Sequence, residues 1–184
     1  ASGEKAVFFY RANVTPPADY AAWNAFIGAL VGHWRERYGA DELRRWYFEV
    51  WNEANLSAFW SGTQAEYFRL YGETARTIKA VDPELRVGGP ASTRGEWLSE
   101  LIAWCRERNL PIDFLSTHVY PDDDDFGKVD PDYRRIFERG DYLEKVVQAA
   151  ADEAAKAYPA AGERPKVHWT EWNSSWRWGR PIHD

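Results

Sequence analysis

The sequence has very little cysteine, no long apolar run and no excess of positive charge. Cys105 is the single cysteine in 184 residues, so no disulfide can form within the chain, and we expect a small buried hydrophobic side chain at this position. The net charge of −6 argues against nucleic acid or an anionic membrane surface as a partner. No apolar run approaches the roughly 18 residues that span a bilayer, so no transmembrane segment is expected.

The chain also lacks the common signatures of targeting and of cofactor binding. No charged and then apolar leader opens it, but a mature or excised chain would lack one too, so the compartment stays open. No His, Cys and Asp cluster has metal-ligand spacing, no Gly-x-x-x-x-Gly-Lys loop occurs, and Val87-Gly-Gly-Pro is too short for a dinucleotide loop. We therefore expect no metal and no other cofactor. The acidic run Asp122–Asp125 can be read as a metal site, although such runs in loops are more often simply solvated.

Aromatic residues are abundant, at 16% of the chain with 11 tryptophans. Such a number exceeds the usual need of a core and suggests a surface that stacks on flat ligands, sugars above all. The alternative is that the tryptophans are large core fillers.

Hydrophobic periodicity predicts helices that alternate with strands along the whole chain. A strand-like Ala-Val-Phe-Phe-Tyr run comes first, within residues 1–15. Helices are expected over 20–37, 64–81, 96–108 and 141–158, and strands over 46–51, 85–90, 112–121 and 166–170. This order favours a parallel α/β sheet over a sandwich. No linker or low-complexity stretch divides residues 1–184, which predicts a single domain.

Two glutamates, Glu53 and Glu171, lie in matching contexts at the ends of predicted strands. They occur in Trp-Tyr-Phe-Glu-Val-Trp-Asn-Glu at 46–53 and in Val-His-Trp-Thr-Glu-Trp-Asn at 167–173. Hydrolysis of a glycosidic bond needs two carboxyl groups that face each other across a sugar. The flanking Trp51 and Trp172 are expected to offer flat apolar surface to a sugar ring. The alternative for either glutamate alone is a helix cap or an ion pair with arginine.

Side chains alternate along a strand, and this predicts which residues share a face with the glutamates. The sets expected on one side are Tyr47, Glu49, Trp51 and Glu53 in one strand, Val167, Trp169 and Glu171 in another, and His118 with Tyr120 in a third. Because the carboxyl ends of parallel strands build the active sites of such folds, the three sets are expected to meet there. Asn52, next to Glu53, can hold a sugar hydroxyl.

These residues resemble a known family. Phe-Glu-Val-Trp-Asn-Glu-Ala-Asn-Leu at 48–56, followed by Phe59-Trp60, is similar to the acid/base motif of glycoside hydrolase family 39, which holds β-xylosidases and α-L-iduronidases. Val87-Gly-Gly-Pro-Ala, Asp113-Phe-Leu-Ser-Thr-His-Val-Tyr-Pro and Thr170-Glu-Trp-Asn-Ser-Ser resemble its following strands in the family's order. Asn13-x-x-Pro-Pro and His33-x-x-x-Arg-Tyr-Gly resemble the approach to the acid/base strand.

The resemblance implies a (β/α)8 TIM barrel, of which this chain supplies roughly strands four to seven. It implies that Glu53 is the acid/base and Glu171 the nucleophile. It further implies that Asn52 binds the 2-hydroxyl and that His118 and Tyr120 line the subsite near the nucleophile. The family usually has proline where Ala54 stands, a change that relaxes the loop.

The implied function is a retaining glycoside hydrolase that acts on β-xylosides or related short glycosides through a covalent glycosyl-enzyme. A (β/α)8 barrel typically takes about 250 residues, and strands resembling one to three are absent here. The alternative is therefore a non-catalytic or split-barrel fragment that binds carbohydrate without turnover of its own. The expected partners are a carbohydrate substrate and, to complete the barrel, either another copy of the chain or a complementary chain. Neither nucleic acid nor a membrane is expected.

Overall fold

The structure is a computed structural model that describes residues 6–7, 10–11, 13–120, 141–158, 165–173 and 176. The acidic run Asp122–Asp125 lies outside the described residues, so its role as a metal site or a solvated loop stays a prediction.

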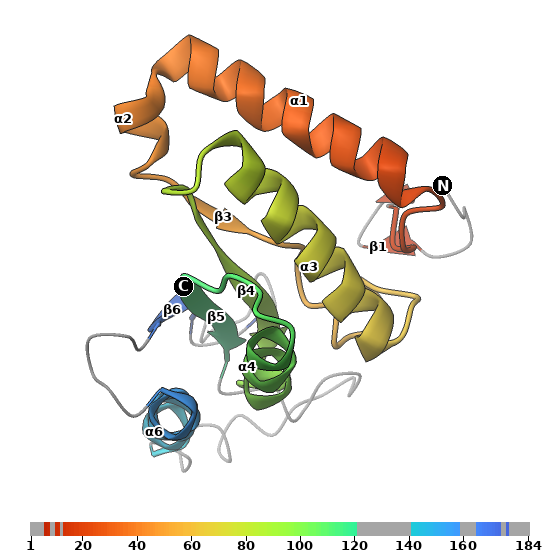
Figure 1. Cartoon of the computed structure of the whole chain (residues 1–184). Coiled ribbons are helices and arrows are strands. Elements are labelled where there is room, and N and C mark those ends of the chain that lie inside the picture. Colours follow the sequence, from red (N-terminus) through yellow and green to blue (C-terminus); the bar gives the residue numbers. More distant parts are fainter. Residues whose placement is uncertain are drawn as a thin grey trace.

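A four-stranded parallel sheet forms the centre of the molecule (Figure 1). Its strands, in spatial as well as chain order, are β3 (Tyr47–Glu49), β4 (Arg86–Thr93), β5 (Phe114–Val119) and β6 (Lys166–Trp172). All three neighbouring pairs are parallel. The predicted parallel α/β arrangement is confirmed.

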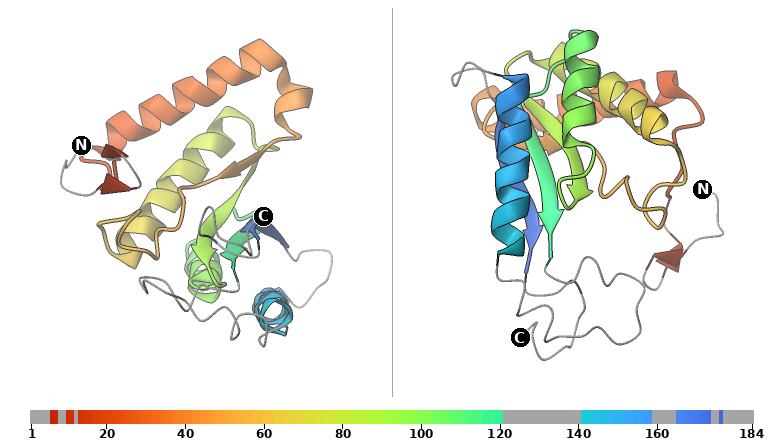
Figure 2. Two further views of the ribbon diagram at one scale, coloured as in Figure 1. Left: turned by 180° about the vertical axis from the view of Figure 1, so that it is seen from behind. Right: turned by 90° about the horizontal axis from the view of Figure 1, so that it is seen from below.

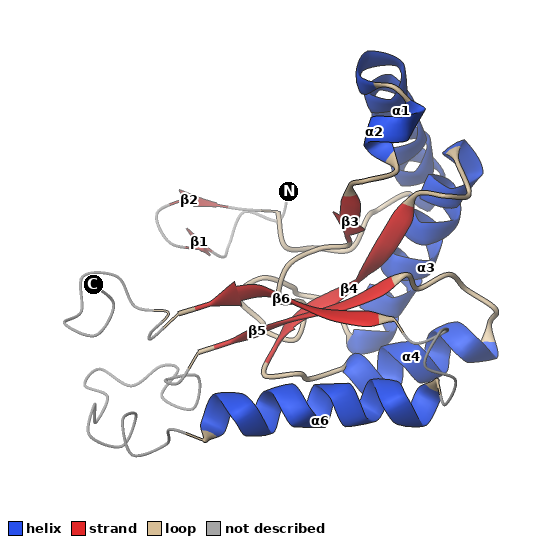
Figure 3. Ribbon diagram, turned by 90° about the vertical axis from the view of Figure 1, so that its left-hand side faces the viewer, coloured by secondary structure: helices blue, strands red, loops and turns tan. Residues whose placement is uncertain are grey.

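In the described part of the chain, the helices cover one face of this sheet and leave the other face open, as Figure 3 shows. They are α1 (Tyr20–Tyr38), α2 (Ala40–Leu43), α3 (Gln64–Val81), α4 (Leu98–Glu107) and α6 (Tyr142–Ala157). Helix α1 packs on α3, and α4 packs on α6; in the right-hand view of Figure 2, α4 and α6 run alongside the strands. Short helix α2 was not expected. The predicted first strand is divided between β1 (Ala6–Val7) and β2 (Tyr10–Arg11), which pair antiparallel.

Local capping explains where the two longest helices begin and end. The Asp19 side chain accepts from two backbone N–H groups at the start of α1, and Gly39, with φ of +86°, ends that helix. Thr63 and Glu66 form a reciprocal capping box at the start of α3. Such caps satisfy backbone donors that the first turn leaves free and contribute about 1 kcal/mol each.

Two apolar clusters lie between the sheet and its helices. The larger joins β3 and β4 to α1, α3 and α4, and includes Trp60, Tyr67, Leu70, Tyr71 and Leu101. The smaller joins β5 and β6 to α4 and α6, and includes Leu98, Ile102, Leu115, Ala150 and Ala154. Cys105 belongs to the first cluster and is fully buried, as predicted; burial raises the pKa of its thiol to about 12. No helix in the described segments has the length and apolarity to cross a membrane.

The open face of the sheet is concave. Side chains of the two outermost strands meet across it. The rings of Tyr47 in β3 and His168 in β6 lie 4.7 Å apart, and Phe114 in β5 contacts both. Burial lowers the pKa of His168. Gly88 in β4 makes room for this layer, since a Cβ there would lie 2.2 Å from the Phe114 carbonyl oxygen. The sheet is thus half of a barrel, with the concave face as the interior.

Candidate active site

Glu53 lies in the loop after β3, at the carboxyl end of the sheet. Its backbone N–H donates to the Ala91 carbonyl of β4 at 2.8 Å, and its own carbonyl accepts from the Leu56 N–H at 2.9 Å. Its φ is +46°, and that of Trp51 is +69°. This left-handed conformation costs a non-glycine residue about 1 kcal/mol or more. The two backbone hydrogen bonds hold the strained segment in place, so the direction of the Glu53 side chain is fixed by its neighbours.

His118 reaches the same place from β5. Alternation directs Phe114, Ser116 and His118 to the concave face, where Ser116 Oγ accepts from the Ala91 N–H at 3.1 Å. Leu115, of opposite parity, packs outward in the smaller apolar cluster. The His118 side chain is only 1% exposed, so the ring is fixed within the sheet interior.

Glu171 is directed inward by an irregularity in β6. Thr117 pairs with Trp169, but the next β5 residue, His118, pairs with Glu171, so Thr170 is one residue too many. A β-bulge of this kind changes the face to which the following side chains point, and bulges are common beside active sites. Glu171 therefore shares the concave face with His118.

The bulge makes one sequence prediction wrong. Strict alternation predicts Val167, Trp169 and Glu171 on one side. Val167 and Trp169 in fact pack outward against the cluster under α4 and α6, while Glu171 contacts His118. In the other strand, Tyr47 and Glu49 lie on the concave face, but the left-handed backbone after β3 ends the simple alternation before Trp51 and Glu53.

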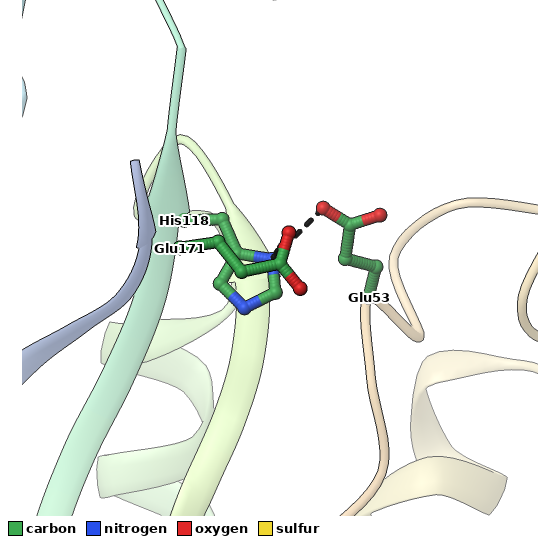
Figure 4. Close-up of side chains that lie close together, drawn as sticks. All are labelled: Glu53, His118 and Glu171. Carbon is green, nitrogen blue, oxygen red and sulfur yellow. Dashed lines mark hydrogen bonds and ion pairs between the residues drawn. The ribbon is translucent and has the colours of Figure 1, made fainter. Parts of the chain in front are cut away.

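The two carboxylates and the imidazole converge at the carboxyl end of the strands (Figure 4). His118 Nδ1 lies 2.9 Å from Glu53 Oε1 and 3.5 Å from Glu171 Oε2. One ligand atom from each of the three residues lies within 4.8 Å of the others. Because a carboxylate only accepts hydrogen bonds, the tautomer that fits carries its hydrogen on Nδ1 and donates to Glu53.

Tyr120 holds Glu171 from a second direction. Its hydroxyl donates to Glu171 Oε2 at 3.0 Å. Two carboxylates this close repel each other when both are ionised, and the donors from His118 and Tyr120 offset that repulsion. The Glu53 side chain is 10% exposed and that of Glu171 43%, so one carboxyl group is enclosed and the other faces open space.

The same three residues form the one group among the described residues whose side chains have metal-ligand chemistry and proximity. Imidazole and carboxylate groups together are typical zinc ligands. The hydrogen bonds from His118 and Tyr120 give the carboxylates partners of another kind. The sequence prediction of a site without metal stays a prediction.

A hydrogen-bonded network ties the Glu53 loop to the end of β4. Asn55 Nδ2 donates to Thr93 Oγ1 at 2.7 Å and to Glu96 Oε2 at 2.9 Å. The Thr93 backbone N–H donates back to Asn55 Oδ1 at 3.1 Å. All of the amide's polar atoms therefore hold neighbouring loops together, two residues away from Glu53.

The other predicted site residues, Trp51, Asn52 and Trp172, have three different environments. Trp51 lies edge-on to Trp60 at 5.1 Å, and its indole N–H donates to the Phe59 carbonyl, so its contacts are with the core side of the loop. Asn52 is half-buried in the loop. Trp172, at the end of β6, is 71% exposed. Their roles as substrate contacts stay predictions.

Sequence reasoning missed Thr170 and Asn55, and it assigned no role to Glu49. Thr170 Oγ1 donates to Glu49 Oε1 at 3.0 Å across the concave face. No local pattern marks a bulge, since it depends on how β6 pairs with β5. Asn55 is close to Glu53 in the sequence, but its partners, Thr93 and Glu96, are 38 and 41 residues away.

Comparison with known proteins identifies relatives over the full chain. The model of the glycosyl hydrolases family 39 matches residues 1–184. A β-xylosidase of Caldicellulosiruptor saccharolyticus is 45% identical over 187 aligned residues, which cover 100% of this chain. A β-xylosidase of Geobacillus stearothermophilus is 42% identical over 190 aligned residues, again covering 100% of this chain.

A solved structure agrees in fold. The crystal structure of the family 39 enzyme from Xanthomonas axonopodis pv. citri superposes with a TM-score of 0.78 at 39% identity, covering 96% of this chain and 34% of that one. The chain spans 36% and 37% of the length of the two β-xylosidases. The half-barrel is thus the part of a larger TIM barrel that the sequence predicts.

Proposed function

The chain belongs to glycosyl hydrolase family 39, and from that premise we propose that the protein containing it is a retaining glycoside hydrolase. Its substrates are β-xylosides or related short glycosides, and its intermediate is a covalent glycosyl-enzyme. The substrate class rests on the two β-xylosidases that match the whole chain.

The observation that carries the proposal is the short distance between the two carboxylates. Oxygens of Glu53 and Glu171 lie within 4.8 Å of each other. Retaining enzymes hold their carboxyl groups about 5–5.5 Å apart, whereas inverting enzymes leave roughly 6.5–9.5 Å for a water molecule. The observed spacing favours direct attack by a carboxylate over attack by a water between the two.

The environments of the two groups suggest their roles. Glu171 is the more exposed carboxylate, oriented by Tyr120 and His118, and it attacks the anomeric carbon. Glu53, enclosed and held by His118 at Oε1, acts in its protonated form: the proton on its other oxygen passes to the leaving oxygen as the glycosidic bond breaks. In the second step, Glu53 takes a proton from water, the water oxygen bonds to the anomeric carbon, and the ester bond to Glu171 breaks.

The remaining predicted residues are assigned to substrate binding. Asn52, beside Glu53, binds the 2-hydroxyl, a contact that strengthens in the transition state. Tyr120 lines the subsite near Glu171. Trp51 and Trp172 provide apolar surface next to the sugar. We assign no metal and no other cofactor to the reaction.

The barrel needs further polypeptide to enclose this site. In the described part of the chain, β3 and β6 each pair with one neighbour only. We propose that more of the same protein, or a complementary chain, supplies the missing strands. The second candidate is a fragment that binds carbohydrate without turnover, because an incomplete barrel leaves the two carboxylates open to water.

A panel of chromogenic glycosides, tested on this chain and on any longer form of the protein, distinguishes the candidates. Turnover of xylosides, with a product that keeps the β configuration by NMR, supports the retaining enzyme. Glu171→Gln should lower kcat by roughly a thousandfold or more on every substrate. Glu53→Gln should lower kcat about a hundredfold or more for poor leaving groups and much less for nitrophenolate, because an activated leaving group needs no proton.

The matched control is Glu36→Gln, which removes an exposed carboxylate on α1 and should leave the rates unchanged. Inverted product, or full activity of Glu171→Gln, contradicts the proposal. Saturable sugar binding without turnover in every form of the protein favours the second candidate.

A further inference from the structure

Thr170, the extra residue of β6, makes a side-chain contact that a bulge does not require. Its hydroxyl donates to Glu49 Oε1 at 3.0 Å. Glu49 is the last residue of β3, which lies at the opposite side of the four-stranded sheet. The hydrogen bond therefore crosses the whole concave face and joins two strands that share no backbone hydrogen bond.

Each partner lies close in sequence to one of the two site carboxylates. Thr170 directly precedes Glu171, and Glu49 lies four residues before Glu53. Between Glu49 and Glu53, the backbone is tied to β4 through the Val50 and Glu53 N–H groups, which donate to the Gly88 and Ala91 carbonyls. A change in the spacing of Thr170 and Glu49 is thus passed on to both carboxylates over short, constrained segments.

The bulge gives this contact its importance. If β6 paired with β5 without the bulge, Thr170 would lie opposite His118, and Glu171 would share the outward direction of Val167 and Trp169. In the bulged strand, Thr170 and Glu171 both face the concave side, and the hydrogen bond to Glu49 on the far strand fixes the position of the residue that directly precedes Glu171.

We propose that Thr170 and Glu49 are a pair of positioning residues that sets the separation of the Glu53 and Glu171 carboxylates. The proposal rests on the proposed function of these two glutamates. Neither member touches the reacting atoms. Thr170 fixes the direction in which the Glu171 side chain points. Glu49 connects Thr170 to β3, the strand that leads to Glu53.

Both side chains are exposed in the described part of the chain, so conservative replacements should fold. Thr170→Val keeps the shape and removes the donor, whereas Thr170→Ser keeps the donor. Glu49→Gln keeps an acceptor oxygen, and Glu49→Ala removes it. Thr77→Val is the matched control, because it removes a hydroxyl that donates to a backbone carbonyl within α3, away from the site.

The experiment measures kcat and KM on xylosides, together with thermal midpoints, in the longest form of the protein that contains this chain. We expect Thr170→Val and Glu49→Ala to lower kcat by about ten- to a hundredfold with KM within about twofold. Thr170→Ser and Glu49→Gln should retain activity within about threefold, and Thr77→Val should match the parent. The double variant Thr170→Val with Glu49→Ala should be no slower than the slower single variant.

Equal rates for Thr170→Val and the parent would overturn the pairing, as would full additivity in the double variant. Equal losses in Thr170→Ser and Thr170→Val, with lowered midpoints, would mean a structural role only. An inactive parent would instead count against the proposed function. A crystal structure of Thr170→Val tests the pair even then, since the Tyr120 hydroxyl should move away from Glu171 Oε2, and an unchanged distance contradicts the inference.

Discussion

Asn55 connects the loop that carries Glu53 to the neighbouring strand, and it does so with every polar atom of its side chain. Its three hydrogen bonds to Thr93 and Glu96 span 2.7–3.1 Å. Glu53 itself has a strained backbone, with φ of +46°. A strained conformation persists only where the surroundings hold it, so the orientation of Glu53 depends on this amide.

We therefore expect Asn55→Ala to lower both stability and activity. Loss of the network should reduce the free energy of unfolding by about 1–3 kcal/mol, and kcat on xylosides should fall by roughly tenfold or more. Urea unfolding and steady-state kinetics measure the two effects. Asn24→Ala is the control, because it removes one hydrogen bond between α1 and α3, to Glu73, and should cost stability alone. Full activity of Asn55→Ala would contradict this role.

For single residues, the sequence predicted correctly which side chains converge. It did not predict the backbone features that direct them there. Glu53, His118 and Glu171 do lie together, because each lies near the carboxyl end of a strand of one parallel sheet, Glu53 in the loop just after it. The direction of Glu171 was not predictable from alternation, since the extra residue Thr170 is defined only by pairing with β5. Trp51 packs on Trp60 because the chain leaves the extended conformation after β3.

Among the elements, one buried acid at the end of α3, Asp82, contacts arginines of both α1 and the end of α2. Asp82 caps the end of α3 and is 3% exposed. It accepts from the Glu84 backbone N–H and from Arg44 Nε, each at 3.0 Å, and lies 3.8 Å from Arg35 Nε. These contacts, the Glu84 N–H foremost, hold the pKa of Asp82 below its usual value.

The lowered pKa predicts how Asp82 affects stability as pH changes. A carboxyl group with a lower pKa in the folded state adds stability above its unfolded pKa of about 3.9, and that stability is lost as pH falls through the folded value. Asp82→Asn should cost about 2 kcal/mol at pH 7, and the difference from the parent should vanish toward pH 2. Thermal unfolding across pH 2–7 measures it. A difference that stays constant with pH would contradict the ionised role.

The strand β4 depends on a glycine for the packing of the interior layer. A Cβ on Gly88 would lie 2.2 Å from the Phe114 carbonyl oxygen and 2.6 Å from its ring, whereas a Cβ on Gly32 in α1 would meet nothing within 4 Å. Gly88→Ala should destabilise by about 2 kcal/mol or more, because backbone must shift. Gly32→Ala should stabilise by about 0.5–1 kcal/mol, because alanine favours a helix interior. Equal effects of the two changes in chemical unfolding would contradict this packing.

The order of long elements was predictable because their periodicity is local. Helices α1 and α3 begin and end within a residue of the predicted ranges, and their caps are sequence-adjacent. Helix α2, with four residues, and the pairing of β1 with β2 carry no such signal. The length of β3, three residues against the six expected, reflects the turn toward Glu53.

For the whole molecule, the half-barrel leaves backbone groups unpaired on the outer edges of β3 and β6 in the described part of the chain. Parallel sheets are normally covered on both faces, and open edges promote association. We expect this chain, expressed alone, to self-associate and to turn over xylosides weakly at best. Size-exclusion chromatography with light scattering, alongside an activity assay, measures both. A compact monomer as active as a longer form would contradict the expectation.

The central claim is that Glu171 forms the covalent intermediate while Glu53 moves the proton. Trapping tests it most directly. The longest active form of the protein is incubated with an activated 2-deoxy-2-fluoro-β-xyloside and digested, and the modified peptide is sequenced by mass spectrometry. We predict one sugar per protein, attached to Glu171, with Glu53 unmodified. A sugar attached to another residue, or hydrolysis of xylosides without any trapped intermediate and with inversion, would contradict it.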